Sequence, residues 1–313
     1  MRSIDAATVH AALPYGKLIP HLRAAFKAGG EVPVRSHYHI DDPAGGAGGT
    51  LLLMPAWQPG RHIGIKAVSV YPDNAKVGLP SVTGAYLLLD ARTGLPKAVI
   101  DGVSLTLRRT GCASALAADY LARKDARHLL MIGAGSLAPH LIRAHCAVRN
   151  YTRIELWNRN RARAEETAER LGDLNASIAV IEDLESAIRV ADTISCATLS
   201  RQPLVQGEWL KPGAHVDLVG GFTPEMREAD DATLTRGSVW VDSRAGALKE
   251  AGDLLLPLKH GLLKPEDVRG DLFDLCRGDA PARRDDKEIT VFKSVGLALE
   301  DLAAAELVVQ GLS

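Results

Sequence analysis

The residues LLMIGAGSLAPHLIRAH, 129–145, hold two glycines and a small residue at the spacing G-x-G-x-x-A. Gly133 permits a tight turn, Gly135 lets backbone amides approach an anion, and Ala138 is small enough for a helix to pack on the preceding strand. An apolar strand before the turn and a helix after it are the context in which this pattern binds a pyrophosphate. The alternative is an ordinary glycine turn. The context favours a dinucleotide site, with Ser136 as a further contact.

The next apolar strand ends in basic and amide side chains. In RIELWNRNRAR, 153–163, no carboxylate stands at the tip, where an NAD site would place an acid for the ribose 2′-hydroxyl. Asn158, Arg159 and Arg161 could instead accommodate a 2′-phosphate, unless the arginines are only the solvated start of a helix. NADPH is therefore the preferred cofactor, with NADH as the alternative.

The elements around these residues change character along the chain. The first hundred residues read as short strands joined by turn signals, which predicts a mixed or antiparallel sheet. From about residue 104 helical stretches alternate with nearly uninterrupted apolar strands, which predicts a parallel sheet covered on both faces. The tail, 291–312, predicts a strand end and one long amphipathic helix. The fold class is therefore α/β.

Composition narrows the class of protein. The chain has 313 residues, 46% hydrophobic and 24% charged, which suits about two globular domains. The net charge of -1 offers no basic field for nucleic acid or a membrane surface. No apolar run approaches the ~20 residues that span a bilayer, and the start lacks a signal region. We expect a cytoplasmic protein.

The metal-ligand residue types are sparse. The four cysteines lie far apart in the sequence and read as reduced thiols: Cys112, Cys146, Cys196 and Cys276. His37 and His39 share one strand face, a spacing that metals can use, but no acid or cysteine accompanies them. No metal is expected.

Nine stretches, in order and across nearly the whole chain, resemble the ornithine cyclodeaminase and mu-crystallin family. They are PVRSHYHI, LLLMPAW, IGIKAVSVYPDN, GLPSVTGAYLLLDARTGLPKAVIDG, LRRTGCASALAADYLA, MIGAGSLAP, LWNRN, GGFTPEMREAD and VFKSVGLALEDLAAAE. The resemblance implies a Rossmann domain over 116–290 and a substrate and dimerisation domain built from 1–115 with 291–313. It also implies a homodimer, with the substrate between the domains.

The family acts at a carbon that bears both a nitrogen and a carboxylate, and passes hydride to or from nicotinamide. The resemblance assigns Arg35, Lys66, Thr83 and Arg109 to the substrate site, with Met54 as a further contact. Arginines can hold a small carboxylate through charge-assisted bonds, and a partly buried lysine can pair with it or exchange a proton. The alternatives are a strand lysine that reaches solvent and a helix-surface arginine.

The resemblance also places residues beside the cofactor. These residues follow the predicted strands: Thr198, Ser200, Val219, Ser294 and Gly296. Strand ends of a parallel sheet are where a dinucleotide binds.

One loop distinguishes among the family's reactions. The cyclodeaminases resemble GGD-x-P there, and the aspartate acts as a base on the distal amine, whereas this chain has Phe222 in GGFTP. Phenylalanine cannot accept a proton, so Phe222 favours reduction of a cyclic imine acid over deaminating cyclisation. FTPEMRE resembles the ketimine reductase branch, which acts on Δ1-pyrroline-2-carboxylate and Δ1-piperideine-2-carboxylate.

Other functions stay open from the sequence. One is another amino-acid enzyme of the family, either a cyclodeaminase or an alanine-type dehydrogenase. A further one is a mu-crystallin-like protein that keeps the cofactor site for ligand binding.

Overall fold

The computed structural model describes residues 1–43 and 45–312. Contacts divide the chain into two compact units. Unit 1 comprises Met1–Arg109 with Leu297–Ser313, and unit 2 comprises Thr110–Gly296. The first boundary lies inside the long helix α3 (Gly102–Leu121), and the second lies just before the last helix.

Unit 1 contains a six-stranded sheet in the order β1-β6-β5-β4-β3-β2. All neighbouring strands are antiparallel except β1 and β6, so the sheet is mixed, as the sequence predicts. Its strands are β1 (Arg2–Ile4), β2 (Ser36–Ile40), β3 (Gly49–Trp57), β4 (His62–Val70), β5 (Val82–Asp90) and β6 (Pro96–Asp101). Its helices are α1 (Ala6–Ala12), α2 (Tyr15–Ala28), the short 3-10 helix η1 (Pro72–Val77) and α11 (Ala298–Gln310).

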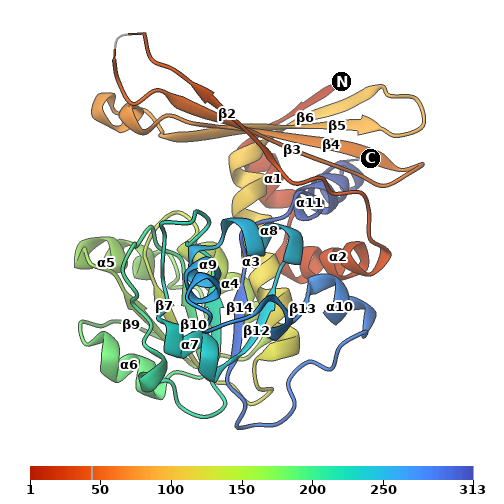
Figure 1. Ribbon diagram of the computed structural model, residues 1–313. Helices are drawn as coiled ribbons and strands as arrows, with labels where there is room; N and C mark the ends of the chain where they lie inside the picture. Colours follow the sequence, from red (N-terminus) through yellow and green to blue (C-terminus); the bar gives the residue numbers. More distant parts are fainter. Residues whose placement is uncertain (44, 313) are drawn as a thin grey trace. The chain divides into compact units, whose positions relative to one another are not determined.

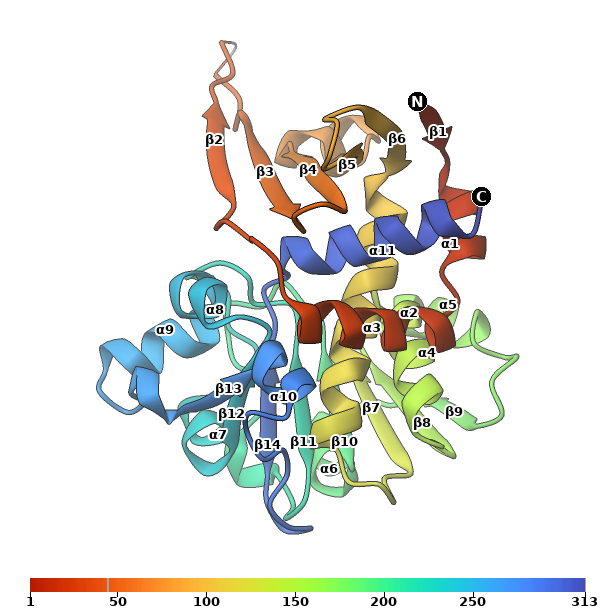
Figure 2. The same ribbon diagram turned by 90° about the vertical axis from the view of Figure 1, so that its right-hand side faces the viewer.

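Helix α11 lies between the sheet and α2, and it contacts β3, β4 and β5 (Figure 2). It is buried almost all round instead of amphipathic, because these elements enclose it. Side chains alternate across a strand, so β3, β4 and β5 each bury alternate residues on the α11 face. Met54 of β3, Lys66 of β4 and Tyr86 of β5 are neighbours in register on that buried face.

Helices α1 and α2 were not predicted, since the first hundred residues read as strands. The signals are nevertheless in the sequence. Asp5 caps α1 by accepting a hydrogen bond from the Thr8 backbone N–H at 2.9 Å. Helix α2 buries Leu18, Leu22 and Phe26 at helical spacing.

Unit 2 contains an eight-stranded sheet in the order β13-β12-β14-β11-β10-β7-β8-β9, and every pairing is parallel. Its strands are β7 (His128–Ile132), β8 (Arg153–Trp157), β9 (Ser177–Val180), β10 (Thr193–Cys196), β11 (His215–Leu218), β12 (Ser238–Val241), β13 (Val268–Asp271) and β14 (Thr290–Lys293). Its remaining helices are α4 (Ala138–Val148), α5 (Arg161–Glu169), α6 (Leu184–Val190), η2 (Gly207–Trp209), α7 (Asp231–Arg236), α8 (Arg244–Glu250), α9 (Gly252–Lys259), η3 (Pro265–Asp267) and α10 (Leu272–Arg277).

Helices cover both faces of the unit 2 sheet (Figure 1). On β7, Leu130 and Ile132 join an apolar cluster with residues of α6 to α9, whereas Leu129 and Met131 join another with α4 and α5. The strand order reverses between β7 and β10, which is the topological switch point of a Rossmann-type, doubly wound sheet. The predicted α/β fold class, with a Rossmann-type sheet and an α+β unit built from both chain ends, is therefore confirmed.

Within the part of the chain that the structure describes, no helix is long and apolar enough to cross a membrane. In the same residues no group of three or more His, Cys, Asp or Glu side chains is arranged to hold a metal ion.

Candidate active site

Unit 1 buries two cations and two carboxylates together. The Nζ of Lys66, on β4, lies 2.7 Å from Oδ2 of Asp301 on α11. The Nε of Arg109, on α3, donates to Oδ1 of the same aspartate at 3.0 Å, and its Nη1 donates to Oε2 of Glu300 at 2.7 Å. All four side chains are at most 6% exposed, so neither cation is a surface charge.

This burial sets the protonation of the cations. Burial and the Arg109 charge lower the pKa of Lys66, Asp301 opposes both, and the resulting pKa is about 8. Burial also acts to lower the pKa of Arg109, but Asp301 and Glu300 raise it above its usual value. Arg109 is therefore a permanent cation, whereas Lys66 can exchange a proton near neutral pH.

Other predicted substrate residues lie at different distances from this cluster. Met54 is the register neighbour of Lys66 and is 4% exposed. Arg35, half-buried and just before β2, is near enough for its charge to contribute to lowering the pKa of Lys66. Thr83 is not brought to Lys66: its hydroxyl lies 2.8 Å from that of Ser69, and both belong to the opposite face of the sheet.

Sequence reasoning missed Glu300 and Asp301. A usable signal exists, because ALEDLAAAELVVQ is an apolar helix that nevertheless carries three acids. Acids in a helix that is apolar all round must be buried with cationic partners. Glu306, the third acid, is also buried, and its carboxylate lies 3.0 Å from Nη2 of Arg61 and 2.7 Å from Nδ1 of His62.

In unit 2 the predicted phosphate turn joins β7 to α4. Gly133 has φ +105°, and a Cβ there would lie 2.5 Å from the Ala197 carbonyl oxygen, so only glycine fits. Gly135 and Ser136 are exposed, and no atom of the described residues lies within 4 Å of the position a Cβ would take at Gly135. Ala138 is 1% exposed and packs in the apolar cluster of β7. The open space above Gly135 fits the approach of a pyrophosphate to the backbone.

The tip of β8 carries the predicted basic residues. Asn158 donates to the Asn160 carbonyl oxygen at 2.8 Å. Arg161 is held by Glu165 at 2.8 Å and Glu182 at 2.6 Å. Arg159 is exposed and makes no hydrogen bond or ion pair within the described residues, so its guanidinium is available to an anion.

The remaining predicted cofactor residues follow the carboxyl ends of β10, β11 and β14. Thr198 and Ser200 are half-buried, and the Ser200 N–H donates to the Thr198 hydroxyl at 3.3 Å. Val219 is 7% exposed, with its side chain in the apolar cluster. The Ser294 hydroxyl and the Gly296 N–H both donate to Asp242, at 3.2 and 2.6 Å. Asp242 thus shapes the turn after β14, and the sequence reading did not identify it.

Phe222 follows the two glycines after β11 and is 43% exposed. Its N–H donates to the Gly220 carbonyl oxygen at 3.0 Å, which closes a tight turn. Glu228, in the same loop, is fully buried. Its carboxylate accepts a hydrogen bond from the Gly220 N–H at 2.7 Å, so it lies against the backbone that leads to Phe222.

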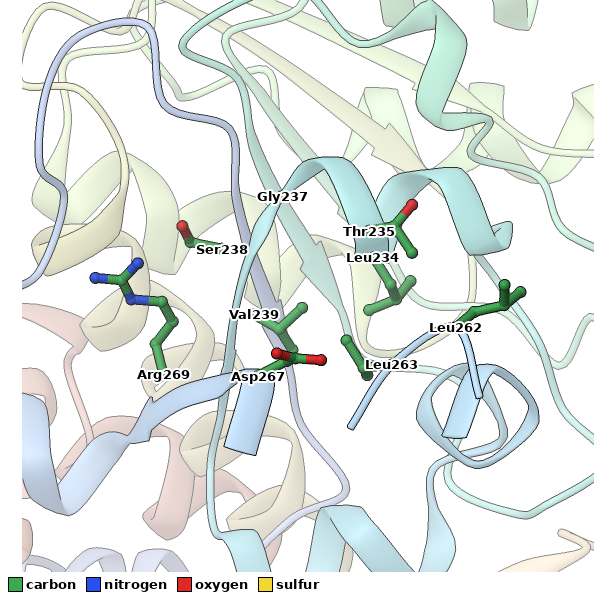
Figure 3. A pocket seen from close by; sticks show the side chains of 9 residues that line it. All are labelled: Leu234, Thr235, Gly237, Ser238, Val239, Leu262, Leu263, Asp267 and Arg269. Atoms are coloured by element: carbon green, nitrogen blue, oxygen red, sulfur yellow. The ribbon is translucent and has the colours of Figure 1, made fainter. Parts of the chain in front are cut away.

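Unit 2 also has a hollow of about 290 Å³ that contains none of the predicted residues. Figure 3 shows Arg269 and Ser238 on one side of it and Leu262 and Thr235 on the other. Ser238 begins β12, so the hollow lies at the amino edge of the sheet. The nucleotide turn lies at the carboxyl edge, and the hollow is therefore not the dinucleotide site.

Comparison with known proteins gives consistent results. The chain is 42% identical over 261 residues to a Δ1-pyrroline-2-carboxylate reductase of Paracoccus denitrificans, and the match covers 83% of each chain. The structure of the Thermococcus litoralis Δ1-pyrroline-2-carboxylate reductase in complex with NADH and L-proline matches with a TM-score of 0.93 at 33% identity, covering 99% of this chain and 97% of that one. An archaeal alanine dehydrogenase dimer with bound NAD matches with a TM-score of 0.91 at 28% identity, covering 99% and 95%.

The family model for the ornithine cyclodeaminase/mu-crystallin family matches residues 4–313, almost the whole chain. The buried Lys66–Arg109 cluster and the dinucleotide turn lie on two units whose folds match these relatives throughout. The chain belongs to the ornithine cyclodeaminase/mu-crystallin family, as its sequence motifs predicted.

Proposed function

We propose that this protein reduces a cyclic imine acid, Δ1-pyrroline-2-carboxylate or Δ1-piperideine-2-carboxylate, to L-proline or L-pipecolate with a reduced nicotinamide cofactor. One observation carries the proposal: unit 1 buries the cations Lys66 and Arg109, and unit 2 of the same chain has a Rossmann-type sheet. The reductases of Paracoccus denitrificans and Thermococcus litoralis support the substrate class.

Arg109 binds the substrate carboxylate. Two of its three guanidinium nitrogens are held by Glu300 and Asp301, which fixes the plane of the group. The third, Nη2, makes no hydrogen bond within the described residues and can donate to the carboxylate. Arg35 contributes a further positive charge on the same unit. A rigid guanidinium orients the small ring before the reaction and so lowers the barrier.

Lys66 donates the proton. Reduction of the C=N bond adds a hydride to the carbon and a proton to the nitrogen. With a pKa of about 8, Lys66 is protonated at neutral pH and can donate to an imine that enters unprotonated. Asp301, at 2.7 Å, stabilises the ammonium and directs it. Thr83 takes no part in this scheme, because its side chain belongs to the opposite face of the sheet.

The cofactor, when bound to unit 2, supplies the hydride. Gly133, Gly135 and Ser136 receive its pyrophosphate at the start of α4. Arg159, with Asn158 beside it in sequence, selects NADPH over NADH by pairing with the 2′-phosphate, since residues 158–160 after β8 include no carboxylate to repel that phosphate.

Phe222 favours imine reduction over cyclodeamination. A deaminating cyclisation needs a base for the distal amine, and the phenyl ring offers neither a proton acceptor nor a counter-charge. An alanine-type dehydrogenase is the second candidate, favoured by the match to the archaeal alanine dehydrogenase.

The protein is a homodimer that pairs through unit 1. The sheet face opposite α11 carries a patch of half-buried apolar side chains: Leu51, Leu53, Pro55, Trp57, Ile63, Ile65, Leu87, Leu89 and Val99. A contiguous apolar face of this kind marks an interface. A second copy presents the same face and can pair with it about a two-fold axis. The archaeal alanine dehydrogenase dimer supports this assembly.

The function is tested by incubating the purified protein with NADPH and Δ1-pyrroline-2-carboxylate, following absorbance at about 340 nm and identifying the product by chiral chromatography. L-proline formed in equal amount to the NADPH consumed supports the proposal. Consumption with pyruvate and ammonia but not with the cyclic imine would favour the alanine-type dehydrogenase.

A further inference from the structure

Three fully buried charged side chains in unit 2 have no role in the reaction as described above. They are Glu228, which follows the Phe222 loop, Asp253 at the start of α9, and Lys293 at the end of β14. The Nζ of Lys293 lies 3.0 Å from Oδ2 of Asp253 and 4.0 Å from Oε2 of Glu228. Buried charges cost stability unless they are paired, so a cluster of this kind requires an explanation.

The Glu228 carboxylate connects two loops. Its Oε1 accepts hydrogen bonds from the Thr198 backbone N–H at 2.6 Å and from the Thr198 hydroxyl at 2.9 Å. Its Oε2 accepts from the Gly220 N–H at 2.7 Å. Thr198 follows β10 and Gly220 follows β11, and these strands are neighbours. One side chain therefore fixes the backbone at two adjacent strand ends on the carboxyl edge of the sheet.

The cluster also explains the two glycines that precede Phe222. A Cβ on Gly220 would collide with the Thr198 backbone and with Oε1 of Glu228. A Cβ on Gly221 would lie 2.5 Å from Oδ2 of Asp253 and 3.2 Å from Nζ of Lys293. Glycine is required because the loop lies directly against the buried charges. The backbone that leads to Phe222 is thus held from beneath.

Asp253 and Lys293 hold Glu228 in turn. The Oδ1 of Asp253 accepts from the backbone N–H groups of Glu228 and Ala229, at 2.7 and 3.0 Å. Lys293 supplies the positive charge that two adjacent buried carboxylates need. Several hydrogen bonds to backbone groups, each charge-assisted, make the arrangement rigid.

We propose that Glu228 is a positioning residue for hydride transfer: it fixes the loops after β10 and β11 that receive the nicotinamide end of the cofactor, and it touches neither cofactor nor substrate. The proposal rests on the function proposed above. Displacing a reacting group by about 1 Å can lower a rate about 100-fold, so a small relaxation of these loops is enough to slow the reaction.

The test uses Glu228→Asp, Glu228→Gln and, as a matched control, Glu225→Gln. Asp keeps the negative charge beside Lys293 but is one methylene too short to reach both loops. Gln keeps the length and one acceptor oxygen. Glu225 is an exposed glutamate of the same loop. The full-length proteins are assayed well below the midpoint of thermal unfolding measured for each, so that every sample is folded.

We expect Glu228→Asp to lower kcat about 100-fold with NADPH and Δ1-pyrroline-2-carboxylate, while the KM for the imine changes less than about threefold. The kinetic isotope effect with 4-deuterated NADPH should rise, because hydride transfer becomes rate-limiting. Glu228→Gln should recover part of the rate, and Glu225→Gln should match the wild type. A kcat for Glu228→Asp within about twofold of the wild type would overturn the proposal, even if the unfolding temperature falls.

Bound-NADPH fluorescence separates this proposal from the function itself. If the wild type consumes no NADPH with the imine, the proposed function fails, and the emission of bound NADPH still reports the nicotinamide environment. A changed emission in Glu228→Asp, with that of Glu225→Gln unchanged, would support the positioning role. Identical emission in all three proteins would refute it.

Discussion

At the scale of single residues, Arg109 is defined by how its nitrogens are used. Nε and Nη1 donate to Asp301 and Glu300, and Nη2 makes no hydrogen bond within the described residues. A lysine at this position can keep a charge beside the carboxylates, but it cannot offer three nitrogens in one plane. A lysine at position 109 would therefore keep the positive charge but remove the planar arrangement of donors that the proposed substrate carboxylate needs.

Arg109→Lys is therefore expected to raise the KM for the cyclic imine by about 10- to 100-fold, the equivalent of one charge-assisted hydrogen bond. Because Arg109 belongs to unit 1 and the nucleotide turn to unit 2, the Kd for NADPH should stay within about twofold. Steady-state kinetics and fluorescence titration measure the two quantities. A parallel loss of both would place Arg109 outside the substrate site.

Arg159 makes a second prediction at this scale. Arg159→Glu should raise the Kd for NADPH at least about tenfold and leave the Kd for NADH nearly unchanged, since only NADPH carries the 2′-phosphate. Arg163→Glu, an exposed position on α5, is the control for a change in overall charge. Equal weakening of both cofactors, or an equal effect of the control, would argue against a phosphate contact.

The sequence predicts cations and glycines at this scale better than it predicts acids. Lys66 and Arg109 stand in motifs, and Gly133 stands in a pattern with a known physical cause. Glu228 stands in no such motif, and its hydrogen bonds reach Thr198, 30 residues earlier. Contacts between residues that are distant in sequence leave no local pattern.

At the scale of elements, α11 brings two carboxylates to the cations of β4 and α3. Asp301 stabilises the charged form of Lys66, whereas burial and Arg109 favour the neutral form. Lys66 is charged below its pKa of about 8 and neutral above it. A reaction that needs the ammonium therefore loses rate as the pH rises through that value.

The wild-type kcat/KM for the imine is thus expected to fall above about pH 8. In Asp301→Asn the ammonium loses its counter-charge, the pKa of Lys66 falls further, and the alkaline limb moves to lower pH. In Lys66→Arg the charge persists and the limb should disappear. Profiles of kcat/KM against pH for the three proteins make the measurement. A limb that stays in place in Asp301→Asn would contradict the coupling.

Elements were predicted well in unit 2 and less well in unit 1. The strands of unit 2 are continuous apolar runs, because helices cover both faces, and such runs are easy to locate. Helices α1 and α2 were not predicted, because the strand-like pattern of residues 32–100 was taken to hold for the first 30 residues as well. The burial of α11 on nearly all sides also depends on packing partners that a helical period does not reveal.

At the scale of the whole molecule, the proposed homodimer would form through the face of the unit 1 sheet opposite α11. Strands β3, β4 and β5 place Leu53, Ile65 and Leu87 on that face, and all three are half-buried. An apolar sheet face left to water would invite association, and a symmetric pair removes it from solvent.

Light scattering coupled to size exclusion should give twice the 33.4 kDa mass of the chain. Leu53→Glu combined with Leu87→Glu puts charges at the centre of this face and should give a monomer, since an unpaired charge in an apolar interface is costly. The exposed Val103→Glu, on α3, serves as the control. A double variant that remains dimeric would place the interface elsewhere.

The most direct test of the central claim compares kcat/KM for two reactions of the wild-type protein: NADPH-dependent reduction of Δ1-pyrroline-2-carboxylate, and ammonia release from L-ornithine with NAD⁺. Because Phe222 offers no base for the distal amine, kcat/KM for ammonia release should be at least about 1000-fold lower than kcat/KM for imine reduction, a difference of about 4 kcal/mol in barrier. Ammonia release at a rate comparable to imine reduction would contradict it.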